Sequence, residues 1–246
     1  MDNIEIKDII YSFLNDYCNK NSMSLIQVNV CITDDMFKTR LEMTNNIREK
    51  IEVRNSKSII ENFNGTISFS GEKPTIILNK KLFLEENNFQ FIQTLIHEYV
   101  HIIDHIDFCN YFDVDISQVD TINDYKYFYY WSEFHAHTES YRYYKLLFTS
   151  HLEYDEQVTH ILETEKPIQD GNVDFLDCFD RIYRSIEFLK RYIVWEEIIK
   201  EKLEVEQKLY PFLDFMEIYK KNQTFKDYIK NKNIFYDEIN RLRQGE

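Results

Sequence analysis

The stretch that decides the fold runs from residue 91 to residue 106 and reads FIQTLIHEYVHIIDHI. Apolar residues cover most sides of a helix drawn through it, which predicts a long buried helix over 82–106. The remaining polar side chains fall on one stripe, made of Gln93, His97, His101 and the pair Asp104 and His105. A buried polar group that lacks a partner costs about 1–3 kcal/mol, so the histidines of this stripe require one.

The spacing of His97 and His101 explains what that partner is expected to be. Residues four apart on an α-helix lie one above the other on the same face, so the two imidazoles can share one zinc ion. Glu98 is offset by about 100° round the helix, which puts it beside the metal. The HExxH motif therefore predicts two zinc ligands, with Glu98 as the general base that takes a proton from zinc-activated water.

A catalytic zinc site needs a third protein ligand, with the fourth position left for water. Glu133 is the first candidate, because it lies 32 residues beyond His101 on a second predicted helix. Small Ala136 follows it and lets that helix pack closely. His137 is on the same face at i+4, so it would either replace Glu133 as the ligand or support the site from behind.

Asp107 is the alternative third ligand. It lies six residues after His101, where metzincin-type enzymes place their last ligand. That arrangement requires a sharp turn at a glycine, and Asp104 occupies the corresponding position. Met216, the only later methionine, is too far along the chain to form the Met-turn of such enzymes.

Other side chains are candidates for supporting roles. Asp104 is expected either to hydrogen-bond the free nitrogen of a ligand histidine or to be a plain surface carboxylate. A donor on the second helix would stabilise the developing oxyanion, and the candidates are Tyr129, Tyr130, His137 and Tyr141. The strand expected over 75–78 is a candidate to pair with an extended substrate.

The rest of the pattern predicts an α+β domain. Only four Gly and three Pro occur, which favours helices over an all-β fold. Residues 34–60 are ambiguous. The predicted elements are helices over 4–20 and 125–152, a strand over 24–33, and a hairpin that joins 66–69 to 75–78.

These elements predict a small antiparallel sheet packed on the HExxH helix and on a second ligand helix. A zincin-like metallopeptidase domain over 1–155 would be followed by a helical extension over 156–246 that packs on it. The apolar residues of 185–246 suit such packing, and a surface for a protein partner is the alternative.

Composition argues against several other classes of protein. The formal charge of −14 is unfavourable for nucleic acid as the main partner. The four cysteines form no CxxC pair, so neither a disulfide framework nor a thiolate zinc site is expected. The chain begins without a signal-peptide pattern and has no run of about 20 apolar residues, so we expect a cytoplasmic protein with no membrane partner.

The run 92–101, followed by 132–136 (SEFHA), resembles the gluzincin pattern of HExxH with a downstream ExxA. Over residues 60–150 the chain is similar, more narrowly, to the compact ImmA/IrrE-type metallopeptidases of bacteria and their mobile elements. It departs from the commonest form of that family in two places. Val100 stands where glycine is usual, and Phe134-His135 follow the glutamate where a further acidic residue is common.

The resemblance implies a zinc peptidase with His97, His101 and Glu133 as ligands and Glu98 as general base. Its substrate would be a protein or peptide, and since some members of the family act on repressor-like proteins, an intracellular regulatory protein is one expected target. The alternative is a zinc-containing pseudo-peptidase or mobile-element regulator that acts by protein binding through its C-terminal helices. The intact motif favours the enzyme, because a structural zinc site does not need Glu98.

Overall fold

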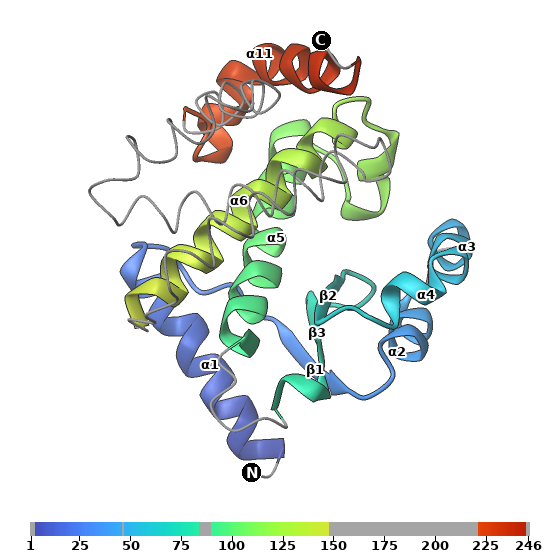
Figure 1. The fold of residues 1–246 in the computed structure, drawn as a ribbon, viewed down its shortest axis with the longest axis vertical. Helices are drawn as coiled ribbons and strands as arrows, with labels where there is room; N and C mark the ends of the chain where they lie inside the picture. The colour runs from blue at the N-terminus through green and yellow to red at the C-terminus, as the bar shows by residue number, and fades with distance from the viewer. Residues whose placement is uncertain (1–2, 46, 84–89, 148–220, 245–246) are drawn as a thin grey trace, which may run out of the picture. The chain divides into compact units, whose positions relative to one another are not determined.

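A computed structural model describes residues 3–45, 47–83, 90–147 and 221–244 (Figure 1). The described chain combines helices with one small sheet, so the expected α+β class is confirmed. Residues 148–220 lie outside the described residues, and they include most of the helical extension predicted over 156–246. The boundary expected at residue 155 therefore stays a prediction.

The chain divides into two compact units, Met1–Tyr125 with Thr138–Phe148, and Lys126–His137 with Thr149–Glu246. Helix α6 (Tyr125–Leu147) contributes residues to both units. The other described elements of the first unit are α1 (Asn3–Lys20), β1 (Asn29–Thr33), α2 (Met36–Met43), α3 (Ile47–Asn55), α4 (Lys57–Ile60), β2 (Gly65–Ser68), β3 (Thr75–Asn79), a 3-10 helix (Lys80–Phe83), α5 (Gln90–Phe112) and a second 3-10 helix (Ile116–Thr121).

The sheet has the strand order β1-β3-β2. β2 and β3 form the predicted antiparallel hairpin, whereas β1 pairs with β3 in parallel, so the sheet is mixed. β3 is the central strand, and its two edges are already occupied by β1 and β2. The expectation that the strand over 75–78 pairs with a substrate is therefore wrong, because the backbone groups it would use are already paired.

Both faces of the sheet are covered within the first unit. Helix α5 contacts β2 and β3 and also α1, so it lies between α1 and the sheet (Figure 1). On the other face, Ile77 of β3 packs with Met36, Val53 and Ile60 from α2, α3 and α4. Successive side chains of a strand point to opposite faces, so Ile76 and Leu78 point toward α5, and both are fully buried.

Tyr99, inside the HExxH motif, fixes α5 to the N-terminal part of the chain. Its hydroxyl accepts a hydrogen bond from the backbone N–H of Ile26 at 2.8 Å and lies 3.4 Å from the Cys18 Sγ. Its ring also meets that of Tyr17 edge to face. The Tyr99 side chain is fully buried, and this burial raises the pKa of its hydroxyl well above its usual range.

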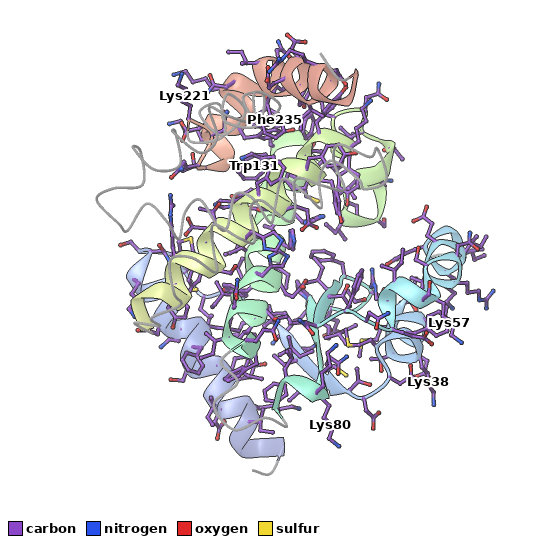
Figure 2. The ribbon with its side chains drawn as sticks, in the orientation of Figure 1. Lys38, Lys57, Lys80, Trp131, Lys221 and Phe235 are labelled. Atoms are coloured by element: carbon purple, nitrogen blue, oxygen red, sulfur yellow. The ribbon has the colours of Figure 1, made fainter. Side chains whose placement is uncertain are left out.

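The second unit is organised around aromatic side chains. Trp131, in the part of α6 that belongs to this unit, stacks on Tyr228 of α11 (Phe225–Gln244), with ring centroids 4.9 Å apart. Tyr228 in turn meets Phe235 edge to face, and Figure 2 shows Trp131 and Phe235 between the two helices. None of the helices in the described parts of the chain is long and apolar enough to cross a membrane.

Candidate metal centre

His97 and His101 lie on one face of α5, as their spacing predicts. Their Nε2 atoms are 3.0 Å apart, and the two rings are nearly perpendicular, at 87°. Two nitrogens bound to one tetrahedral zinc at 2.0–2.1 Å would be about 3.3 Å apart. The imidazoles therefore already point their Nε2 atoms at a common position, close to the spacing that a shared ion needs.

Glu133 of α6 completes a group of three. His97, His101 and Glu133 each offer one ligand atom, and all three atoms lie within 4.8 Å of one another. No other group of three or more His, Cys, Asp or Glu side chains in the described ranges could hold a metal ion. Two imidazole nitrogens and one carboxylate oxygen form a donor set that suits a divalent metal ion. Three protein ligands also leave a fourth tetrahedral position open.

Helix α5 argues against the alternative ligand Asp107. A metzincin-type site needs the chain to turn sharply after the second histidine, but α5 continues unbroken to Phe112. Asp107 is exposed on this helix, and it is not in the group with His97 and His101. The helix continues because Asp104, rather than glycine, occupies the position where the chain would turn.

His137 lies next to the candidate ligand Glu133, one turn further along α6. Its Nε2 atom is 4.0 Å from the Glu133 Oε2 atom, and the two side chains are 20% and 31% exposed. Of the roles expected for His137, this contact is consistent with support of the Glu133 carboxylate, which stays a prediction. Nearby His135 faces differently and stacks on the Trp131 ring.

Asp104 is not a surface carboxylate, since only 1% of it is exposed. That alternative for Asp104 is wrong. Its negative charge and that of Glu139 add to the effect of burial in raising the pKa of Tyr17 well above its usual range, so Asp104 lies near α1. A hydrogen bond from Asp104 to a ligand histidine stays a prediction.

Three tyrosines were candidates for contact with an oxyanion. Tyr130 is half-buried on α6, Tyr129 is 46% exposed, and the Tyr141 side chain lies outside the described residues. Their role toward an oxyanion stays a prediction.

His105 has a role that the sequence did not reveal. It is buried, and its Nδ1 atom lies 2.7 Å from the backbone carbonyl of His101 while its Nε2 atom lies 3.2 Å from the Tyr125 hydroxyl. A carbonyl oxygen can only accept, so the Nδ1–H donates to it. His105 thereby links the turn that holds His101 to the first residue of α6. The feature of the sequence that could have indicated this role is a third histidine at i+4 from His101.

The glutamate of the motif, Glu98, is buried as well, with 8% exposed. It is not part of the three-ligand group, in keeping with its offset round the helix. The first residue of β2, Gly65, lies directly against it.

No family model matches the chain, and neither the curated proteins nor the solved structures contain a match to it.

Proposed function

We propose that this chain is a zinc-dependent metallopeptidase of the gluzincin type, similar to the ImmA/IrrE-like enzymes. The observation that supports it best is the group of His97, His101 and Glu133, whose ligand atoms lie within 4.8 Å of one another. Two histidines and a glutamate are the ligands of one large class of catalytic zinc sites, whereas structural zinc sites use four protein ligands, commonly with cysteine among them.

Glu98 is the proposed general base. A zinc ion held by three protein ligands lowers the pKa of a water molecule to about 7 and polarises a carbonyl. Glu98 accepts the proton of the attacking water and passes it to the leaving amine. The side chain is 8% exposed, so it is shielded from bulk water, as proton transfer at a closed site requires.

The substrate would lie along β2 instead of β3. β2 is an edge strand of the described sheet, and it begins at Gly65, beside Glu98. An extended peptide that added a strand at this edge would run past the proposed base. Such binding uses main-chain hydrogen bonds, which suits a protein or peptide substrate.

The first experiment separates the base from the ligands. Glu98→Gln should bind zinc as the wild-type chain does and lose peptide hydrolysis, because an amide cannot accept the proton. Zinc content would be measured by mass spectrometry, and hydrolysis with an unfolded protein substrate such as casein. Activity that survives in Glu98→Gln at the wild-type rate would reject the assignment.

The second experiment tests the third ligand. Glu133→Ala should bind zinc far more weakly, because two protein ligands remain. Asp107→Ala is the matched control: it also removes a carboxylate from one of the two helices and should bind zinc normally. If instead Asp107→Ala loses the metal and Glu133→Ala keeps it, the gluzincin assignment fails.

The same measurements address the rival function, a zinc-containing pseudo-peptidase that acts by protein binding. Such a protein would bind zinc through the three ligands, but it would hydrolyse no peptide, and Glu98→Gln would leave its properties unchanged.

A further inference from the structure

Gly65, the first residue of β2, lies too close to α5 for a side chain to fit unless its neighbours move. A Cβ atom built on Gly65 would lie 2.6 Å from the Cγ2 atom of Thr94, 3.0 Å from the Cγ atom of Glu98 and 3.1 Å from its Oε1 atom. Carbon atoms in proteins pack at about 3.5–4.0 Å, so the first separation is a collision and the second is tighter than an ordinary contact. Two of the three atoms belong to the proposed general base.

The backbone at Gly65 is held in place from the opposite side. Gly65 pairs with Leu78 of β3, and the backbone N–H of Asn79 donates to the carbonyl of Asn64 at 2.8 Å. The Asn79 side chain, itself buried, donates to the carbonyl of Phe63 at 3.1 Å. Because these bonds fix the residues around Gly65 to the central strand, the strand cannot easily move away from α5.

Gly65 is not needed for its backbone conformation. Its φ angle lies outside the left-handed region, so alanine could adopt the same backbone. What glycine supplies is space. Thr94 cannot easily give way, since it is β-branched and stiff at χ1. The Glu98 side chain can turn about its own bonds, so it is the neighbour that would move.

We propose that Gly65 is a positioning residue for Glu98: the space left by its missing side chain is the space in which the Glu98 carboxylate is held. The inference rests on the proposed function for its effect on hydrolysis, but the placement of Glu98 can be measured without it. A side chain at residue 65 displaces the Glu98 carboxylate while the metal ligands on the same helix stay in place.

The test is Gly65→Ala, with Gly71→Ala as the matched control. A Cβ atom on Gly71 would meet its nearest neighbour, the carbonyl oxygen of Lys73, at 3.5 Å, an ordinary contact in the same hairpin. Gly65→Ala should keep wild-type zinc content and KM, and its kcat should fall by about 100-fold, the typical effect of a 1 Å misplacement. Gly71→Ala should match the wild type in all three.

A second readout needs no substrate. With 13C-labelled glutamate carboxyl groups, and Glu98→Gln to assign the resonance, the chemical shift of the Glu98 carboxyl carbon is measured by NMR at one fixed pH. This chemical shift should change in Gly65→Ala and stay unchanged in Gly71→Ala. This measurement still tests the placement of Glu98 if the wild-type chain hydrolyses no peptide, an outcome that would overturn the proposed function alone.

A third variant, Thr94→Ser, separates the contact of residue 65 with Thr94 from its contact with Glu98. Serine removes the Cγ2 atom that would come within 2.6 Å, so Gly65→Ala/Thr94→Ser should fold even if Gly65→Ala does not. The double variant should keep the altered chemical shift of the Glu98 carboxyl carbon and the low kcat. Full recovery of both, or a wild-type chemical shift and kcat in Gly65→Ala, would overturn the proposal.

Discussion

The indole Nε1–H of Trp131 donates to the backbone carbonyl of Asn222 at 2.7 Å, although 91 residues separate them in the chain. Asn222 lies just before α11, and its side-chain oxygen accepts a hydrogen bond from Asn231 within that helix at 3.0 Å. Trp131 is two residues before the candidate ligand Glu133. The C-terminal helix therefore stabilises the part of α6 that bears the third ligand.

The first prediction concerns this hydrogen bond. Trp131→Phe keeps an aromatic ring but leaves the buried Asn222 carbonyl without the indole donor, which should lower the free energy of unfolding by about 1–3 kcal/mol. Loss of ring volume adds to this cost. Urea unfolding followed by circular dichroism measures the change. Tyr129→Phe, at a ring that is 46% exposed on the same helix, should cost little, and equal costs for the two would contradict the assignment.

A second prediction follows from three buried tyrosines. Burial raises the pKa of Tyr17, Tyr99 and Tyr143 above the ordinary value near 10, and in Tyr143 the hydrogen bond to Asp16 raises it further. Below pH 10 these hydroxyls are neutral in both the folded and the unfolded chain, so their contribution to the free energy of unfolding is fully present. As the pH rises above 10 the unfolded chain loses these protons and the folded chain keeps them, so stability falls.

The measurement is the free energy of unfolding in urea between pH 8 and pH 11.5. Each such tyrosine contributes a slope of up to about 1.4 kcal/mol per pH unit above pH 10. Tyr17→Phe should reduce the slope there and leave the dependence between pH 6 and pH 8 unchanged. A slope above pH 10 that is identical in Tyr17→Phe and wild type would show that the hydroxyl ionises equally in both states.

Much of the first unit could be predicted from the sequence, since its signals are local. Helix α1 was expected over 4–20 and spans Asn3–Lys20, and the β2–β3 hairpin follows from the turn residues that separate two short β-rich runs. The helix expected over 82–106 instead begins at Gln90, after a 3-10 helix at Lys80–Phe83, and ends at Phe112. Helix ends depend on a few hydrogen bonds that periodicity does not report.

Features that depend on contacts between residues far apart in the chain could not be predicted from the sequence. The parallel pairing of β1 with β3 joins residues 29–33 to 75–79, and the strand expected over 24–33 begins only at Asn29. At the site, the spacing of His97 and His101 indicated their shared face, but nothing in the sequence marked Gly65 as a neighbour of Glu98. The close approach of Gly65 to Thr94 and Glu98 results from the packing of β2 on α5.

A third prediction tests the region that the sequence left ambiguous, 34–60. Asp35 caps α2, since its side chain accepts a hydrogen bond from the backbone N–H of Lys38 at 2.8 Å. Asp35→Ala should lower the free energy of unfolding by about 1 kcal/mol, the usual cost of losing an N-cap. Asp34→Ala removes an exposed neighbouring carboxylate that caps nothing in α2, so it is the control. A larger cost for Asp34→Ala would mean that the helix begins elsewhere.

The last prediction concerns the contact between His137 and Glu133, whose Nε2 and Oε2 atoms are 4.0 Å apart. A group that supports a metal ligand is worth about 10- to 100-fold in metal affinity. His137→Gln should therefore bind zinc about 10- to 100-fold more weakly than wild type. Its loss of zinc affinity should be smaller than that of Glu133→Ala, which removes a ligand atom outright. Competition with a coloured zinc chelator measures both affinities.

His135→Gln is the matched control, because it removes a histidine from the same turn of α6. His135 stacks on Trp131, with ring centroids 4.8 Å apart, so its loss should lower stability and leave zinc affinity unchanged. If His137→Gln instead lost as much affinity as His97→Ala while Glu133→Ala kept its zinc, His137 would be the third ligand and Glu133 its support. Equal zinc affinity in His137→Gln and wild type would show that the contact with Glu133 does not bear on the metal.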